Sequence, residues 1–146
     1  MAPQAGDSLG VTINSRDRKT QFANVDLDLR VRGDLSPVIA ALGERVLVIH
    51  QDKSRGRHWV RLSLVQPRSP EHAIRKLAVL LAGLPPSARR TLKKAKKELD
   101  IGIEGGNDPA SAEWVLSPDV IAAVAALGAQ VRITVYSASL AAVRQT

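Results

Sequence analysis

The sequence contains no cysteine, few aromatic residues and no long apolar segment. Without cysteine, disulfides, thiol catalysis and thiolate metal sites are excluded. Aromatic side chains make up 3% of the 146 residues, which argues against a protein that stacks single-stranded bases on aromatic rings. The longest uncharged apolar runs, residues 77–84 and 120–129, are far shorter than the roughly 20 residues of a membrane helix. We therefore expect no membrane association.

The first ten residues lack the basic start and the apolar stretch of a secretory signal, so a cytoplasmic protein is expected. The length fits one domain, and a chain of this size buries a sizeable core without disulfides or metal. Residues 1–20 are polar and have no sustained period, so we predict that they form a flexible N-terminal tail. Residues 21–146 are predicted to form a single domain.

Charge is distributed unevenly along the chain. The formal net charge is +7, but residues 1–97 carry a net charge of +11 and residues 98–146 a net charge of −4. An asymmetry of this size attracts polyanions to one part of a molecule. It is also compatible with a basic surface that has no partner.

Apolar residues alternate with polar ones at residues 22–32, 58–66, 99–103 and 131–136, which predicts strands with one buried face. An apolar run predicts a further strand at 45–51. Helices are predicted where a serine followed by proline precedes a helical apolar period, at Ser36, Ser69 and Ser117. Ser87 begins another helix, which we expect to continue to about Lys97.

A strand, a Leu-Ser-Pro helix start, an Ala-Leu-Gly helix end and a second strand occur twice in the same order. The first copy covers residues 27–50 and the second covers residues 99–136. Duplication explains this order, although these residues are also simply good helix caps. We predict an α+β fold in which pseudo-duplicated β-α-β units form one mixed or antiparallel sheet with the helices packed on one face. The two units are expected to superpose, apart from a longer loop before Trp114.

The strand VDLDL followed by Leu-Ser-Pro, the strand around Trp59 and the closing segment LSPDVIAAVAALGAQVRITVY resemble a bacterial family. It is the domain-of-unknown-function family numbered four-two-seven-nine. The resemblance covers residues 22–137, and residues 116–136 are its most specific part. It implies a compact bacterial α+β domain and supplies no catalytic residue.

The motifs of several enzyme classes are missing. No Gly-x-Ser-x-Gly segment indicates a nucleophilic serine, and the glycines at 102, 105 and 106 form no phosphate-binding fingerprint. No cofactor is expected. His50 and His58 flank the predicted hairpin loop, and Asp52 is the nearest third ligand. Because a metal site needs that third ligand, we predict no zinc there and no catalytic residues.

Four carboxylates lie on predicted wet strand faces: Asp26, Asp28, Asp100 and Glu104. If the two strands pair, crowding of like charges would raise a pKa, as a catalytic carboxylate pair requires. The alternative is neutralisation by arginines on the same face, namely Arg30, Arg32, Arg61 and Arg132. We favour the second interpretation, because ion-paired open faces are common in antiparallel sheets.

The basic segment is the clearest functional signal. Six cations lie on the predicted helix 87–97, all expected to point outward, and the hairpin loop 52–58 adds three more. The candidate polyanion-binding residues are Arg89, Arg90, Lys93, Lys94, Lys96, Lys97, Lys53, Arg55 and Arg57. They would contact phosphates rather than read bases. A solvated basic face is the simpler alternative.

The sequence favours a non-enzymatic protein-interaction domain that binds an unknown protein partner through its open sheet face or an edge strand. The alternative is a basic nucleic-acid-binding domain that contacts phosphates through the helix and the hairpin loop. A third hypothesis is an enzyme with a carboxylate site on the sheet face.

Overall fold

The computed structural model describes residues 18–137. Its centre is a five-stranded mixed sheet in the order β2-β3-β1-β4-β5. The strands are β1 (Gln21–Arg32), β2 (Val46–Ser54), β3 (Arg57–Leu64), β4 (Lys96–Glu104) and β5 (Ala129–Tyr136). The central strand β1 is antiparallel to β3 and β4, β2 is antiparallel to β3, and β5 is parallel to β4.

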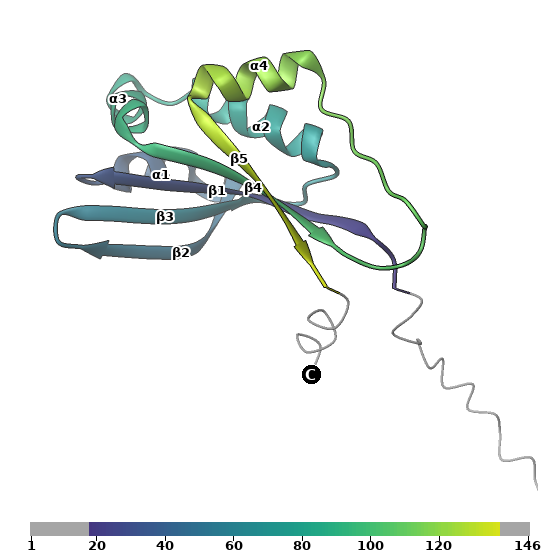
Figure 1. Ribbon diagram of the computed structural model, residues 1–146. Helices are drawn as coiled ribbons and strands as arrows, with labels where there is room; N and C mark the ends of the chain where they lie inside the picture. Colours follow the sequence, from purple (N-terminus) through teal and green to yellow (C-terminus); the bar gives the residue numbers. More distant parts are fainter. Residues whose placement is uncertain (1–17, 138–146) are drawn as a thin grey trace, which may run out of the picture.

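Four α-helices cover one face of this sheet, as Figure 1 shows. They are α1 (Ser36–Leu42), α2 (Pro70–Ala82), α3 (Pro86–Lys94) and α4 (Pro118–Leu127), and a single 3-10 turn, η2 (Gly43–Arg45), follows α1. The predicted α+β class, mixed sheet and one-sided helix layer are therefore confirmed. No helix of residues 18–137 covers the other face of the sheet, which we call the open face.

The alternation of β1 determines which residues form the core. Val25, Leu27 and Leu29 are fully buried beneath the helices, while Asp26 and Asp28 lie on the open face. Burial of a leucine side chain stabilises the folded protein by roughly 1.5–3 kcal/mol. The strand therefore stabilises the fold most when its odd-numbered, apolar residues face the helix layer. The helices supply matching apolar residues, among them Val38, Ile74 and Leu77.

Helices begin at all three predicted serine-proline pairs, but the serine caps the helix at only two of them. Ser69 accepts a hydrogen bond from the His72 backbone N–H, and Ser117 accepts one from Val120. The predicted capping role of Ser36 is wrong, because Ser36 is the first residue of α1 itself. There the Asp34 carboxylate accepts hydrogen bonds from both the backbone N–H and the hydroxyl of Ser36, since a carboxylate is as good a capping acceptor as a hydroxyl.

The turn between β2 and β3 is shorter than the predicted loop. Both strands extend further than expected, and only Arg55 and Gly56 remain between them. Both residues have positive φ, +53° and +72°, which is the type I′ geometry that suits the twist of a two-residue hairpin. The tight turn holds Arg55 at the tip of the hairpin.

Helix α3 also ends earlier than predicted. The chain becomes extended at Ala95, and β4 begins at Lys96. The Lys97 ammonium turns inward and donates hydrogen bonds to the carbonyls of Leu92 and Ala95, each at 2.8 Å. The lysine thus satisfies carbonyls that the helix leaves without partners at its C-terminus.

The two β-α-β units are both present, and their helices lie on the same face of the sheet. In each unit the two strands are parallel, but β4 and β5 are neighbours whereas β3 lies between β1 and β2. The strands of the first unit are therefore separated by two strand spacings, about 9.6 Å, and those of the second by one. The expectation that the units superpose is wrong for this reason.

The predicted N-terminal tail lies mostly outside the described residues. At its end the Thr20 backbone N–H donates to the Asp108 carbonyl, and the Thr20 hydroxyl accepts from the Gly106 N–H. These bonds join the start of β1 to the long loop between β4 and α4.

Candidate polyanion-binding site

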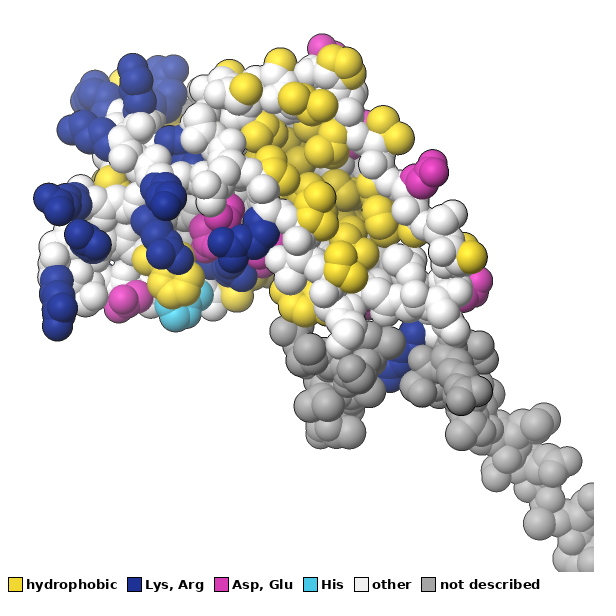
Figure 2. Space-filling model, in the orientation of Figure 1, with side chains coloured by type: hydrophobic (Ala, Val, Ile, Leu, Met, Phe, Trp, Pro, Cys, Tyr) yellow, Lys and Arg dark blue, Asp and Glu magenta, His cyan; other side chains and the backbone are white. Residues whose placement is uncertain are grey.

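A hollow of about 1130 Å³ lies at the end of the sheet where the β2–β3 hairpin meets the junction of α3 and β4. Four separate segments contribute cations to it: the end of β1, the hairpin, the last turn of α3 and the start of β4. The lining cations are Arg30, Arg32, Arg55, Arg57, Lys94 and Lys96, and Asp52 is the one carboxylate that lines it. We call this site the basic hollow. In Figure 2 Lys and Arg side chains gather at this side of the molecule.

In the described part of the chain the cations of the basic hollow form no close ion pairs, although the charge of Arg30 helps to lower the pKa of Asp28. Within residues 18–137, none of the six has a carboxylate oxygen within 4.0 Å. Other cations of the protein are paired: Lys53 lies 3.0 Å from Asp34, and Arg132 lies 3.0 Å from Glu98. Unpaired cations that converge on a concave surface raise the local positive potential.

Trp59 lines the basic hollow from β3, which lies between β1 and β2. The Arg30 guanidinium lies 4.9 Å from its ring centroid, and the His50 ring centroid lies 4.1 Å from it. Its indole N–H donates to Asp28 at 3.0 Å. The ring is therefore engaged by neighbours, and it supports Arg30 through a cation–π contact instead of offering a free stacking surface.

The structure brings together four of the nine predicted polyanion-binding residues. Arg55, Arg57, Lys94 and Lys96 line the hollow. Three more, Arg89, Arg90 and Lys93, are exposed on α3 outside it. The remaining two are placed elsewhere, and the predictions for both need correction.

Lys97 does not point outward. It is 6% exposed, because α3 ends before it and β4 turns its side chain towards the helix layer. Burial lowers the pKa of its ammonium group, and the two carbonyls at the end of α3 hold it in place. Lys53 also faces away from the hollow and pairs with Asp34, since alternation along β2 puts it on the opposite side from Asp52.

Three of the four open-face carboxylates are ion-paired, as the favoured interpretation predicted, whereas Glu104 accepts a hydrogen bond from the Gln21 amide instead. β1 and β4 do pair, with Asp26 opposite Asp100. Arg61 lies between them and contacts Asp28 at 2.7 Å, Asp100 at 3.7 Å and Asp26 at 3.9 Å. Of the other arginines proposed for this role, Arg132 pairs with Glu98, whereas Arg30 and Arg32 line the hollow.

Two neighbouring carboxylates differ in their ionisation. Burial raises the pKa of Asp26, and hydrogen bonding to Ser63 and the charge of Arg61 offset this only in part. Burial also raises the pKa of Asp28, but hydrogen bonds from Arg61 and Trp59 outweigh it, and the net pKa is lowered. Asp28 therefore stays ionised and holds Arg61 in place. This favours a structural role for the carboxylates around Arg61 over acid–base chemistry.

The two histidines considered as metal ligands lie on opposite faces of the sheet. The His50 ring lies tilted against the Trp59 ring at the open face. His58 is buried, and its Nδ1 accepts a hydrogen bond from the Leu35 backbone N–H at 2.8 Å. Because Nδ1 accepts this bond, the short distance from Asp34 to the same ring is not a charged pair. The described part of the chain contains no group of three or more residues placed to hold a metal ion.

Sequence reasoning missed Arg30, Arg32 and Trp59 as parts of this site. The alternation of apolar and polar residues predicts that these three side chains lie on the open face. It does not predict that they lie near Lys94 and Lys96, because this depends on the order of the strands in the sheet. A useful signal was the run of arginines at the end of the first strand, Arg30 and Arg32, followed by Gly33.

None of the helices in residues 18–137 has the length and apolar character needed to cross a membrane. In comparisons with known proteins, no family model, no curated protein and no solved structure matches the chain. The resemblance to family four-two-seven-nine therefore stays a prediction.

Proposed function

We propose that this protein is a non-enzymatic domain that binds the phosphates of nucleic acid in the basic hollow. The observation that carries this proposal is the convergence of six unpaired cations from four segments on one concave surface. Like charges placed this close repel one another, and an anion relieves that repulsion. An extended polyanion suits the open shape of the hollow better than a small enclosed ligand does.

Several features favour contact with the backbone over recognition of bases. Trp59 is already engaged by Arg30, His50 and Asp28, so its ring is not free to stack on a base. Within residues 18–137 the hollow is built from strand ends, a hairpin tip and only the last turn of a helix, α3, so it offers no helix long enough to lie in a groove of the duplex. Lysine and arginine contacts of this kind position a nucleic acid without specifying its sequence.

Binding of a fluorescent duplex DNA, measured by anisotropy over a range of salt concentrations, tests the proposal. Each phosphate contact contributes about −0.9 to the slope of log affinity against log salt concentration. Three contacts would give a slope of about −3. Affinity should be almost the same for unrelated DNA sequences.

A matched pair of triple variants separates a local site from net charge. Arg55→Gln, Arg57→Gln and Lys96→Gln together remove three cations from the hollow. Arg89→Gln, Arg90→Gln and Lys93→Gln together remove three cations from α3 outside it. The first variant should flatten the salt slope, and the second should leave most of it. Equal effects would mean that net charge and not the hollow is responsible, and no binding at about 50 mM salt would remove the proposal.

A second candidate function is protein interaction, and a different observation favours it. Three aliphatic residues of the outer strand β5 are largely exposed, Val131 at 43%, Ile133 at 67% and Val135 at 63%. Contiguous apolar surface on a soluble protein marks interaction sites. A photo-reactive amino acid at position 133 should form a protein adduct in cells, whereas the same group at position 49 should not. Without an adduct at position 133, this second function fails.

The enzyme hypothesis has less support. Arg61 contacts three of its four carboxylates. The pKa of Asp26 is raised, but that of its neighbour Asp28 is lowered, which is the opposite of what a general acid requires. The carboxylates and arginines on the open face, between the basic hollow and β5, are better explained as an ion-pair network that stabilises the fold.

A further inference from the structure

The outer edge of β5 has the properties of a strand that pairs with another strand. No strand within residues 18–137 pairs with this edge. The pairing of β5 with β4 shows no bulge, and Arg132 is its one charged residue. Natural edge strands are normally protected from pairing by lysines, prolines or bulges, and β5 has none of these.

The backbone groups of alternate residues show which positions would pair. The Tyr136 carbonyl accepts from the Gly105 N–H and so faces the β4 side. Because successive residues of a strand direct their N–H and C=O groups to opposite sides, the even positions of β5 bond towards β4. The odd positions, Val131, Ile133 and Val135, direct theirs to the outer edge, and these are also the residues with exposed aliphatic side chains.

A two-fold axis restricts the possible registers. In an antiparallel pair of identical strands, an outward-bonding residue must face another outward-bonding residue, so the axis passes through one residue. An axis at Arg132 or at Ile133 gives the longest overlap. An axis at Arg132 sets the two copies of that arginine against each other, which is unfavourable. An axis at Ile133 places Arg132 opposite Thr134 and Val131 opposite Val135.

We propose that β5 pairs antiparallel with β5 of a second copy of this chain, with the two-fold axis at Ile133, to form one continuous ten-stranded sheet. This inference rests on the second candidate function, a protein contact at β5, and does not depend on anion binding. Val131, Ile133 and Val135 of both copies then form one apolar row on the helix side of the sheet. Arg132 already has Glu98 at 3.0 Å, so pairing brings no uncompensated charge into the contact.

The charge distribution favours a second copy at this edge. The hairpin cations of the basic hollow, Arg55 and Arg57, lie on the β2–β3 side of the sheet, away from β5. Lys96 of β4 lies nearer to β5, but β5 itself carries one charged residue, Arg132, which is ion-paired. Two molecules with a net charge of +7 each therefore meet through an edge with little unpaired charge and keep their hairpin cations apart. The other sheet edge, β2, is a poorer partner because a bulge between Val48 and His50 interrupts its register, and Asp52 and Lys53 lie on it.

Sedimentation velocity over a concentration series tests the inference. The native chain should reach twice its 15.7 kDa mass as concentration rises. Ile133→Lys should weaken the association at least about tenfold, because it puts two ammonium groups opposite each other at the axis. Ile49→Lys, an equivalent change on the edge strand β2, should leave the association unchanged. Circular dichroism of both variants checks that the fold is intact.

A single cysteine tests the register directly, since the native chain has no cysteine. Directly opposed residues of a hydrogen-bonded antiparallel pair have Cα atoms about 5.5 Å apart, within the roughly 4.4–6.8 Å of disulfides. Ile133→Cys should therefore form a covalent dimer under mild oxidation much faster than Ile49→Cys. A dimer that Ile133→Cys does not cross-link would overturn the register.

The remaining outcomes distinguish the second copy from other occupants. A chain that stays monomeric at every concentration overturns the dimer. If the photo-reactive group at position 133 then yields an adduct of a mass other than twice the chain, the protein contact survives with a different partner. If it yields no adduct, both the dimer and the protein contact at β5 fail.

Discussion

The two edge strands of the sheet each expose three aliphatic residues, but they present them differently. On β2 they are consecutive, Leu47, Val48 and Ile49, and on β5 they alternate, Val131, Ile133 and Val135. Side chains alternate between the faces of a strand, so Leu47 and Val48 lie on opposite faces, whereas the three β5 residues share one face. The same number of exposed aliphatic residues therefore forms a row on one face of the sheet at the β5 edge only.

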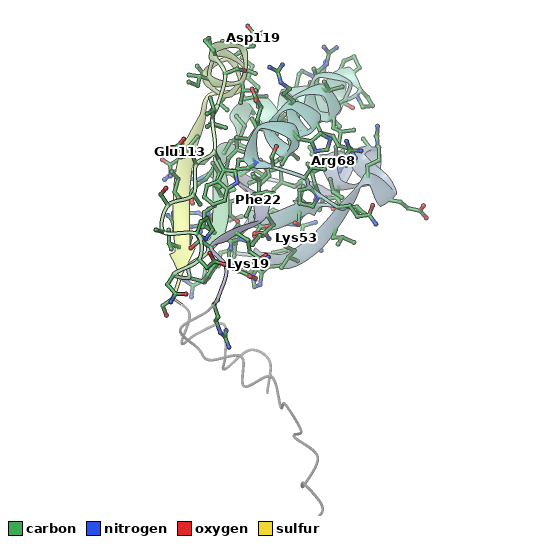
Figure 3. All side chains as sticks on the ribbon, turned by 90° about the vertical axis from the view of Figure 1, so that its right-hand side faces the viewer. Lys19, Phe22, Lys53, Arg68, Glu113 and Asp119 are labelled. Atoms are coloured by element: carbon green, nitrogen blue, oxygen red, sulfur yellow. The ribbon has the colours of Figure 1, made fainter. Side chains whose placement is uncertain are left out.

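Charge separates the two edges further. The β2 side carries a bulged register and the hairpin whose tip, with Arg55, forms one wall of the basic hollow. The β5 side carries one charged strand residue, Arg132, which is ion-paired. Figure 3 shows β5 along one side of the molecule, with α4 and Asp119 above it. The same sheet thus presents one surface suited to binding polyanions and a second surface, the β5 edge, suited to pairing with a further strand.

The largest effect is expected at the ion-pair network between the two regions. Asp28→Ala removes the acceptor of Arg61 and of the Trp59 indole N–H. Loss of hydrogen bonds to charged groups at a mostly buried site should lower the free energy of unfolding by about 2–3 kcal/mol, measured by urea denaturation. Glu104→Ala on the same face is the control and should change stability by no more than about 0.5 kcal/mol. Comparable effects would mean that Asp28 does not anchor the network.

The independence of the two regions can be tested with the same variants used above. The triple hollow variant should lower affinity for a short DNA duplex at least about tenfold and leave self-association unchanged. Ile133→Lys should weaken self-association and leave the affinity for DNA unchanged. The affinity does not depend on the dimer, because the duplex is too short to reach the hollow of a second copy. Anisotropy and sedimentation on the same samples measure both properties. A variant that changed both equally would show that the two surfaces are coupled.

A smaller effect is expected at the hairpin tip. Arg55 adopts a left-handed conformation at φ +53°, which costs a non-glycine residue roughly 1–2 kcal/mol. Asparagine tolerates this geometry better, so Arg55→Asn should raise the free energy of unfolding by about 0.5–1 kcal/mol while it weakens DNA binding. Gly56→Ala should instead destabilise the protein, since the next position also has positive φ. A destabilised Arg55→Asn variant would mean that Arg55 makes a contact that outweighs its backbone strain.

The smallest effect concerns the pH dependence at Asp26. Because the folded-state pKa of Asp26 is raised, ionisation of this group favours the unfolded state as pH rises through that pKa. Asp26→Asn resembles the protonated acid and should stabilise the protein at neutral pH by less than about 1 kcal/mol. The advantage should disappear as the pH falls below both pKa values. Asp28, whose pKa is lowered, contributes stability at neutral pH that is lost on acidification, so Asp28→Asn should have the opposite sign.

Much of the fold could be predicted from local pattern. The alternation around Leu27 and Leu29 identified a half-buried strand, and the cap at Ser117 with the left-handed Gly128 bounded α4. These features depend on residues close together in the chain, so sequence alone expresses them. The ends of helices and strands were less predictable. Lys97 lies in β4, and its ammonium group donates hydrogen bonds to carbonyls at the end of α3. The apolar periodicity of the sequence does not predict this contact.

The sequence by itself therefore determined the α+β class, the buried faces of β1, β3 and β4 and the excess of positive charge in the first 97 residues. The buried face predicted for residues 131–136 is wrong, because β5 is an edge strand on which Val131, Ile133 and Val135 stay exposed. Only the tertiary structure decided that β3 lies between β1 and β2, that Arg30 and Arg32 join Lys94 and Lys96 around one hollow, and that β5 is an edge. The physical reason is that strand order comes from long-range pairing, in which many arrangements satisfy the same local alternation of apolar and polar residues. Which cations meet, and which aliphatic residues stay exposed, follows from that order.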